Sequence, residues 1–261
     1  GYKPRIVIVK GLGIFACGKN AKEAETAREV FVDAVKIAYF AKAFGGVKPM
    51  TPDLIDFIVN WEVESYRSKV SLAVGSGKRL EGKIVIVTGG AQGFGKGIAD
   101  AMAAEGANIV IADMNADGAE KAALEYGVHG YSVAANVTDE DSVKNMIDRT
   151  VLAFGGLDVF VNNAGVVKAG SLEEMTKKNL EFVTAVNYTG YFLCTKYASA
   201  VMKIQHRIAP SYMMDIIEIN SKSGLAGSNK NFAYAGSKFG GIGLTQSFAL
   251  ELVPYNIKVN A

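Results

Sequence analysis

From residue 84 onward, short apolar runs alternate with longer stretches in which apolar residues recur every three or four positions. The runs are rich in β-branched residues, as buried strands are, and the longer stretches have the periodicity of helices. This alternation predicts βαβ units, and therefore an α/β fold with a doubly wound parallel sheet that helices cover on both faces. The expected strands are 84–88, 108–113, 131–134, 157–162, 215–220 and 256–260.

The first eighty residues follow a different pattern. An apolar run at 6–9 leads into a glycine-punctuated segment, after which apolar residues at three- and four-residue spacing predict a helix over 21–44. A second helix is expected over 52–66, because Pro52 suits the first turn of a helix. Residues 71–83 are rich in Gly, Ser and Lys, and we expect them to form a linker.

These patterns predict two domains, a small α+β segment with its linker at 1–79 and the sheet domain at 80–261. The sequence starts at Gly1 rather than Met and stops at Ala261, within the last expected strand. We therefore expect two incomplete pieces of a longer chain, with the sheet truncated at its C-terminal end.

Composition argues against several classes of protein. The chain has 261 residues and a formal net charge of +2, and it has no run of Lys and Arg, so we expect no nucleic-acid partner. No apolar stretch approaches the roughly 18 residues that span a bilayer, so no membrane is expected. Cys17 and Cys194 are far apart, which favours reduced thiols and a cytoplasmic protein. His129 and His206 lack partners at metal-ligand spacing, so we expect no metal.

The first strand of the sheet domain ends in a glycine-rich turn that precedes a helix. The residues from Thr88 to Gly95 read TGGAQGFG, in which glycines at 89, 93 and 95 form a GxxxGxG pattern and a further glycine stands at 90. Glycines allow a tight turn and a close approach to a pyrophosphate, and a helix N-terminus supplies N–H donors. Such a turn is weak evidence by itself, because a purely structural turn between strand and helix can have the same residues.

Asp113 strengthens the interpretation as a dinucleotide site. It ends the second strand, where a carboxylate can accept hydrogen bonds from the hydroxyls of the adenosine ribose. A carboxylate repels a 2′-phosphate, and Gln92 in the turn offers no cation for one. These two residues favour NAD over NADP.

A set of polar residues follows the later strands. Tyr234 and Lys238 are four residues apart on one face of an expected helix, and Ser221 follows the fifth strand. Bringing the pKa of a Tyr from about 10 to about 7 requires roughly 4 kcal/mol of phenolate stabilisation, part of which a cation one turn away supplies. We therefore expect Tyr234 to be a general acid/base, Lys238 to lower its pKa, and Ser221 to polarise the substrate oxygen.

Residues 80–261 resemble the short-chain dehydrogenase/reductase family. The TGxxxGxG turn of the family is matched by Thr88, Gly89, Gly93 and Gly95, and its NNAG segment is matched by Asn162 to Gly165. The active-site residues of the family are matched by Asn187, Ser221, Tyr234 and Lys238. Asn136 departs from the family, which usually has an acid after the third strand, but an amide can still hydrogen-bond adenine. The resemblance implies a Rossmann-type sheet, a hydride-transferring oxidoreductase and bound NAD.

The resemblance also implies roles for these residues. Lys238 is expected to bind the nicotinamide ribose, and Asn187 is expected to position a water that relays the proton to solvent. A homo-oligomer is implied, associating through helices around 171–203 and 233–253. The implied cofactor-binding residues are Gly89, Gln92, Gly93, Phe94, Gly95, Asp113, Met114, Asn136, Val137, Asn163, Ala164, Gly165, Tyr234 and Lys238.

Residues 1–79 resemble the C-terminal end of a class II aldolase/adducin domain. Gly13 to Gly18 keep a glycine interval of that family and Lys22 to Ala24 open a helix, but Leu12 stands where a metal-binding His is usual. The two parts together are similar to bifunctional rhamnulose-1-phosphate aldolase/alcohol dehydrogenases. That similarity implies a small-molecule substrate from deoxysugar metabolism, such as lactaldehyde.

Several alternatives remain open on the sequence. The substrate is also compatible with a sugar alcohol or a sugar phosphate. A function of another class is an NAD-binding module without turnover. The N-terminal segment is also compatible with an ordinary helical extension of the dehydrogenase domain.

Overall fold

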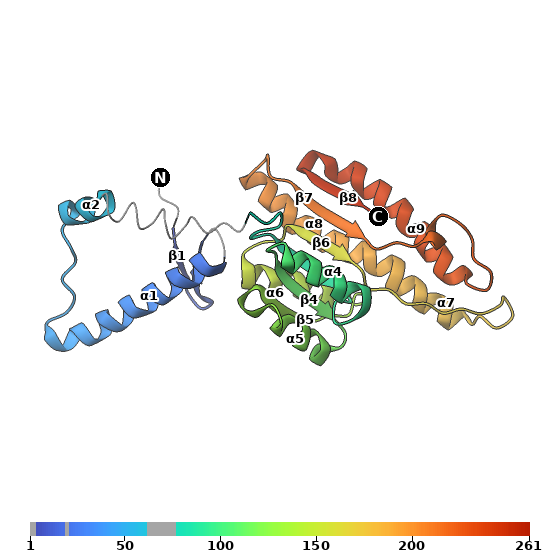
Figure 1. Ribbon diagram of the computed structural model, residues 1–261, viewed down its shortest axis with the longest axis horizontal. Coiled ribbons are helices and arrows are strands. Elements are labelled where there is room, and N and C mark those ends of the chain that lie inside the picture. The colour runs from blue at the N-terminus through green and yellow to red at the C-terminus, as the bar shows by residue number, and fades with distance from the viewer. Residues whose placement is uncertain (1–3, 19–20, 62–76) are drawn as a thin grey trace. The chain divides into compact units, whose positions relative to one another are not determined.

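The computed structural model of the chain describes residues 4–18, 21–61 and 77–261. It divides into two compact units, Gly1–Gly82 and Lys83–Ala261 (Figure 1).

The N-terminal unit contains a hairpin and two helices. Strands β1 (Ile6–Val9) and β2 (Gly13–Ala16) pair antiparallel. Helix α1 (Ala21–Ala41) follows and is extended by a 3₁₀ turn to Phe44, so the helix expected over 21–44 has a tighter last turn. Helix α2 (Pro52–Asn60) is shorter than expected.

The backbone of Trp61 explains the early end of α2. Its ψ of 125° is extended rather than helical, although its N–H still bonds to the carbonyl of Ile58 at 3.3 Å. The remainder of the expected helix, 62–66, and residues 71–76 of the expected linker lie outside the described residues.

The second unit is built on a six-stranded parallel sheet, which confirms the predicted α/β fold. The order across the sheet is β5-β4-β3-β6-β7-β8, so the first strand of this unit, β3, lies between the second and the fourth. Chain direction along the sheet therefore switches between β3 and β6, where α/β sheets bind ligands at the carboxyl ends of the strands. The strands are β3 (Ile84–Thr88), β4 (Asn108–Asp113), β5 (Gly130–Ala134), β6 (Val159–Asn162), β7 (Met214–Glu218) and β8 (Ile257–Asn260).

Two of the expected strands are shifted or shortened by side-chain contacts. Before β6, the N–H of Leu157 donates to Gln205 Oε1 at 2.7 Å, and Asp158 accepts the N–H of Ile84 at 2.7 Å. After β7, the Asn220 side chain accepts the N–H of Ser221 at 2.7 Å and turns the backbone away. These side-chain bonds lie at the ends of the two strands, and backbone pairing still continues at Asp158 and at Ile219.

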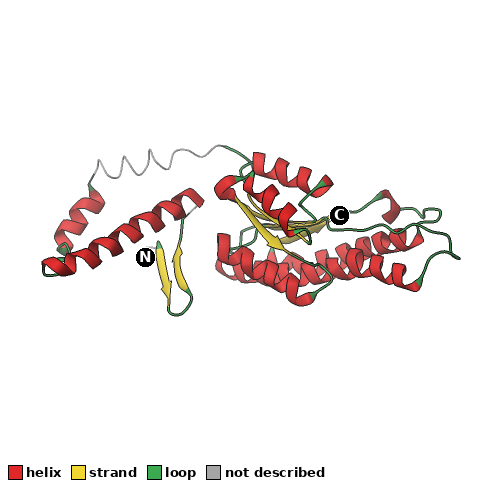
Figure 2. Ribbon diagram, turned by 90° about the horizontal axis from the view of Figure 1, so that it is seen from below, coloured by secondary structure: helices red, strands yellow, loops and turns green. Residues whose placement is uncertain are grey.

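Helices cover both faces of the sheet (Figure 2). Helices α6, α8 and α9 pack side by side, because α8 contacts both of the others. A π-helical turn (Ala185–Thr189) joins α7 directly to α8. The helices are α4 (Gly93–Ala104), α5 (Ala116–Leu124), α6 (Glu140–Phe154), α7 (Lys177–Thr184), α8 (Gly190–Ile208) and α9 (Phe232–Leu252).

The central strands form the core of this unit. Ile86, Val110, Phe160 and Ile216 come from four adjacent strands, and each is fully buried. Among the described helices, none combines the length and apolar character needed to cross a membrane.

Truncating a core side chain should cost far more than truncating an exposed one. We expect Ile86→Ala to lower the free energy of unfolding by about 2–5 kcal/mol, because a buried cavity replaces the lost atoms. Leu124→Ala at the end of α5, where the side chain is 72% exposed, should change it by less than about 0.5 kcal/mol. Urea denaturation of both variants measures the difference, and equal effects would contradict this account of the core.

Candidate active site

Thr88 joins the glycine turn to the segment after β6. Its hydroxyl is fully buried and accepts the N–H groups of Asn163 at 3.0 Å and Ala164 at 3.1 Å. In return, the Asn163 amide donates to the carbonyls of Thr88 and Gly89. The two turns that follow β3 and β6 are therefore held together at the point where the sheet switches direction.

Glycine is required at two positions of this turn. Gly89 has a φ of +62°, and a Cβ there would lie 3.1 Å from Ala164 Cα and from Asn163 Nδ2. A Cβ on Gly95 would overlap the carbonyl oxygen of Gly89. The turn thus packs directly against the Asn163 amide, with no room for a side chain.

The N-terminus of α4 has the features of an anion site. The helix begins at Gly93, whose φ is +59° and whose missing Cβ faces open space, and Gln92 makes no capping hydrogen bond. Its first N–H groups therefore have no side-chain acceptor and remain available to a phosphate. These features fit the pyrophosphate of a dinucleotide.

The carboxylate of Asp113 is held at the end of β4. Its Oδ2 accepts the N–H of Ala91 at 3.1 Å, and its Oδ1 accepts the N–H of Asn115 at 3.0 Å. Each carboxylate oxygen has a further lone pair, which suits the two hydroxyls of an adenosine ribose. The bond to Ala91 also fixes the glycine turn relative to β4.

The other expected cofactor residues differ in their exposure. Gln92, Phe94, Met114 and Gly165 are exposed, and Val137 is buried. Asn136 accepts two bonds from Thr138, at 3.1 and 2.8 Å, which leaves its amide nitrogen to donate to a base.

Ser221 lies just beyond the end of β7. Its Oγ accepts the N–H of Ser223 at 3.2 Å, so its own hydroxyl proton is available to a substrate oxygen. The turn that follows packs on α9, and a Cβ on Gly224 would lie 3.0 Å from the carbonyl oxygen of Lys238. Ser221 is thereby positioned beside the helix that carries Tyr234.

Tyr234 and Lys238 occupy the first two turns of α9. Tyr234 is half-buried, and its carbonyl accepts the hydroxyl of Ser237 at 2.7 Å. Lys238 is 4% exposed, and its Nζ donates to the carbonyl of Ile219 at 2.6 Å. The structure thus brings α9 and the end of β7 together at the lysine.

Asn187 is buried in the π-helical turn. Its Oδ1 accepts the N–H of Val166 at 2.8 Å, and its Nδ2 donates to the carbonyl of Val166 and to Ser237 Oγ. Both amide protons are therefore used within the chain, which ties the segment after β6 to α9. The water relay expected for this residue stays a prediction.

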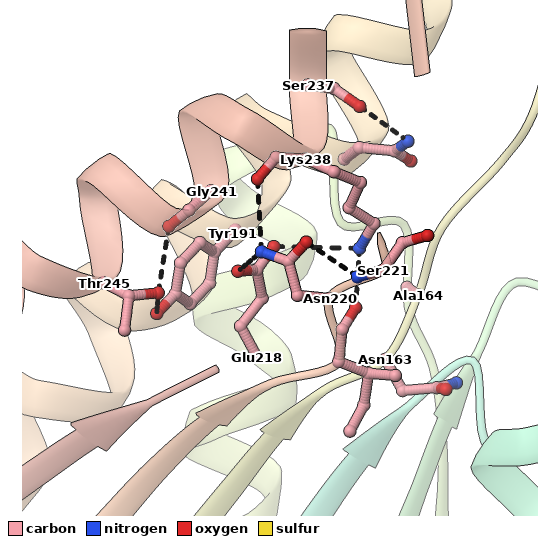
Figure 3. Close-up of polar contacts among 12 residues, drawn as sticks. Asn163, Ala164, Tyr191, Glu218, Asn220, Ser221, Ser237, Lys238, Gly241 and Thr245 are labelled. Carbon is pink, nitrogen blue, oxygen red and sulfur yellow. Dashed lines mark hydrogen bonds and ion pairs between the residues drawn. The ribbon is translucent and has the colours of Figure 1, made fainter. Parts of the chain in front are cut away.

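Glu218 and Asn220 extend the site inward and were not predicted (Figure 3). Glu218 lies 3.7 Å from Lys238 Nζ, and it accepts a 2.9 Å hydrogen bond from Asn220. The signal in the sequence is a single carboxylate in the otherwise apolar run Ile216 to Ile219. Within the described ranges, no three His, Cys, Asp or Glu side chains are grouped closely enough to hold a metal ion.

Comparison with known proteins shows the family. A family model described as short chain dehydrogenase matches residues 83–261, and one described as aldolase class II, second domain, matches residues 1–67. The chain therefore belongs to the short-chain dehydrogenase family, preceded by a segment similar to part of a class II aldolase.

Individual relatives agree with this assignment. A secoisolariciresinol dehydrogenase of Forsythia intermedia is 37% identical over 70% of this chain and 65% of its own length. The uncharacterized oxidoreductase YuxG of Bacillus subtilis is 29% identical over 99% of this chain, which covers 37% of that protein. The chain thus spans about two thirds of the first of these relatives and about a third of the second.

A solved structure supports the fold and the cofactor class. The 3-ketoacyl-(acyl-carrier-protein) reductase of Brucella melitensis, complexed with NADH, has a TM-score of 0.66 and 30% identity. The match covers 69% of this chain and 74% of that one. That structure contains NADH, and its fold is the one to which residues 83–261 of this chain are similar.

Two glycines of α4 provide a matched test of the cofactor turn. We expect Gly95→Ala to weaken NADH binding at least about tenfold, because its Cβ would push the Gly89 carbonyl and the Asn163 amide apart. Gly97→Ala should leave binding unchanged, because a Cβ there meets nothing within 4 Å. Fluorescence titration with NADH measures both, and similar affinities for the two variants would rule out this role for the turn.

Proposed function

We propose that this chain is an NAD-dependent dehydrogenase of a small hydroxyl or carbonyl compound from deoxysugar metabolism, with Tyr234 as general acid/base. The observation that carries the proposal is the approach of the Ser221 turn to α9 at Lys238, one helical turn after Tyr234. Ser221 and Lys238 lie together at the carboxyl end of β7, and Tyr234 precedes Lys238 by one turn of the same helix, which supports the proposal.

The nicotinamide ring, when bound, accepts or delivers the hydride. In oxidation, Tyr234 takes the hydroxyl proton of the substrate at its phenolate oxygen, and in reduction it returns that proton. Lys238 stabilises the phenolate by its charge and binds the nicotinamide ribose. Ser221 donates its free hydroxyl proton to the substrate oxygen, where negative charge develops.

In this proposal, the main role of Asn187 is to hold other segments of the protein in place. Its three bonds hold the segment after β6 and the start of α9 at fixed positions. The remaining lone pair on its Oδ1 is the acceptor through which the side chain would bind a relay water.

The N-terminal unit supports the choice of substrate. Residues 1–67 match part of a class II aldolase, and YuxG is similar to this chain across both units. Joined aldolase and dehydrogenase segments fit a substrate that aldol cleavage of a deoxysugar phosphate releases, such as lactaldehyde. Leu12 cannot ligate a metal, so we assign no aldolase activity to the N-terminal unit.

A sugar alcohol or sugar phosphate is the second candidate substrate. It is favoured by a sorbitol-6-phosphate 2-dehydrogenase of Escherichia coli that is 36% identical over 69% of this chain and 69% of its own length. Exposed lysines also lie on the segments beside the site, at 168, 222 and 230, and the N–H of Gly170 joins two of these segments by a 2.8 Å bond to the Lys230 carbonyl.

A substrate screen with the protein distinguishes these candidates. NADH consumption is measured with lactaldehyde, whose carbonyl group would be reduced, and NADH production is measured with polyols and with their phosphates. Turnover of lactaldehyde supports the first candidate, and turnover of only the polyols or their phosphates supports the second. NADH binding without any turnover would instead indicate a cofactor-binding module.

The role of Tyr234 is tested by removing one hydroxyl. We expect Tyr234→Phe to lower kcat about 10²- to 10⁴-fold, because the proton donor is lost while the ring remains. Tyr126→Phe, which removes a hydroxyl bonded to Asp100 on the surface, serves as the control and should leave kcat unchanged. Retention of kcat in Tyr234→Phe would exclude it as the acid/base.

The preference for NAD is tested at Asp113. We expect Asp113→Asn to raise the ratio of NADP to NAD use at least about tenfold, because it removes the charge that repels a 2′-phosphate. Asp117→Asn, an exposed carboxylate in the first turn of α5, is the matched control and should leave the ratio unchanged. Steady-state kinetics with both cofactors gives the ratio, and an unaltered value in Asp113→Asn would count against this role.

We further propose a cytoplasmic homo-oligomer that associates through α7, α8 and α9. This assembly is supported by exposed apolar side chains on these helices, namely Leu180, Phe182, Phe192, Phe239 and Leu250.

A further inference from the structure

A carboxylate is fully buried beneath the candidate catalytic lysine. Glu218 is the last residue of β7, and its side chain has no exposure to solvent. Burying a charged group is costly unless it is paired and hydrogen-bonded, so this position needs an explanation.

The two oxygens of Glu218 have different surroundings (Figure 3). Oε2 accepts the 2.9 Å hydrogen bond from Asn220 Nδ2. Oε1 has no hydrogen-bond donor, and it lies 3.7 Å from Lys238 Nζ. The lysine ammonium donates to the neighbouring carbonyl of Ile219, and at 3.7 Å the carboxylate is held to it by charge rather than by a direct hydrogen bond.

Helix α9 leaves space for this carboxylate. Gly241 follows Lys238 by three residues, and a Cβ on it would overlap both oxygens of Glu218. Glycine inside a helix costs about 1 kcal/mol relative to alanine. The helix therefore lacks a side chain where the carboxylate approaches it.

Few titratable groups face Glu218 in the described part of the chain. Lys238 from α9 is the cation, and Tyr191 from α8 is the other titratable neighbour. Burial raises the pKa of Tyr191 to about 12, so it stays neutral. Its hydroxyl bonds to Thr245 at 3.1 Å, and Thr245 in turn bonds to the carbonyl of Gly241.

The geometry points to Glu218 as a positioning residue for the dehydrogenase reaction, which keeps the ammonium of Lys238 charged and directed at the end of β7. This inference rests on the proposed function, because it assigns Glu218 an effect on Tyr234 through Lys238. Neither Glu218 nor Asn220 touches the reacting atoms in this scheme.

The electrostatics of the pair agree with this role. Burial lowers the pKa of Lys238, and the negative charge of Glu218 opposes that shift. Burial likewise raises the pKa of Glu218, and Lys238 opposes it. Removing the carboxylate would leave burial unopposed at Lys238, which would then lose its proton more readily and stabilise the Tyr234 phenolate less.

The test compares pH profiles of four variants of the whole chain with the wild type. In Glu218→Gln, we expect the rising limb of kcat/KM for alcohol oxidation to move to higher pH by about one unit, since one unit corresponds to a tenfold change in the ionisation equilibrium. The pH at which NADH binding weakens should move in the opposite direction, to lower values, because Lys238 deprotonates earlier.

The other variants separate electrostatics from packing. Glu218→Asp keeps the charge and should restore part of the wild-type profile. Gly241→Ala should shift both profiles in the same directions as Glu218→Gln, because its Cβ displaces the carboxylate. Tyr191→Phe removes a buried hydroxyl from the same cluster but leaves the ion pair, so its profiles should match the wild type.

The outcomes that overturn the inference are specific. A Glu218→Gln profile that superimposes on the wild type, or a limb that moves to lower pH, excludes the role. If Glu218→Gln does not fold, the pH profile of Gly241→Ala decides the question. An unshifted profile of Gly241→Ala would also exclude the positioning role of Glu218. A wild type that binds NADH but oxidises no substrate overturns the proposed function alone, and the NADH titrations then decide the role of Glu218.

Discussion

The buried hydroxyl of Thr88 joins the two halves of the sheet at their carboxyl edge. It accepts two N–H groups from the segment after β6, while the amide of Asn163 closes the contact from the other side. The groups concerned are more than seventy residues apart in sequence, so the contact forms only once β3 and β6 are paired. The shape of the cofactor turn therefore depends on correct assembly of the sheet rather than on the turn sequence alone.

The part of the candidate site that contains Ser221 and Lys238 is assembled by helix packing. Ser221 and Lys238 come together because the turn after β7 contacts α9 through Gly224. Asn187, in the π-helical turn, makes a further contact with this helix, because its amide donates a hydrogen bond to Ser237 on α9. Helix α9 is thus held at two points close to Tyr234, which restricts movement of this part of the helix relative to the end of the sheet.

Much of the sheet unit could be predicted from the sequence, because its signals are local. Apolar runs marked the strands, and the glycine spacing marked the turn after β3. The ends of β6 and β7 were less accurate, because Gln205 and Asn220 intercept the backbone through side-chain hydrogen bonds. Periodicity records which residues face a core, but it does not record such bonds.

The buried pair of Glu218 and Lys238 lies beyond this kind of prediction. Its members are twenty residues apart, and their approach depends on how α9 packs against β7. A carboxylate in a strand is more often exposed, so the residue type alone favours a different interpretation. The need for a glycine at 241 likewise becomes visible only when α9 is packed against β7, because a Cβ there would overlap the Glu218 carboxylate.

The π-helical turn Ala185–Thr189 has a consequence for the geometry of the helices on either side. An α-helix advances about 100° per residue, so one extra residue in a turn rotates everything after it by about that angle. Helix α8 can therefore direct Leu193 and Cys194 into the core, while Asn187 within the turn still reaches Val166 and Ser237. The wide turn thus changes the rotation of α8 relative to α7. One continuous helix can therefore direct apolar side chains into the core and Asn187 toward the candidate site.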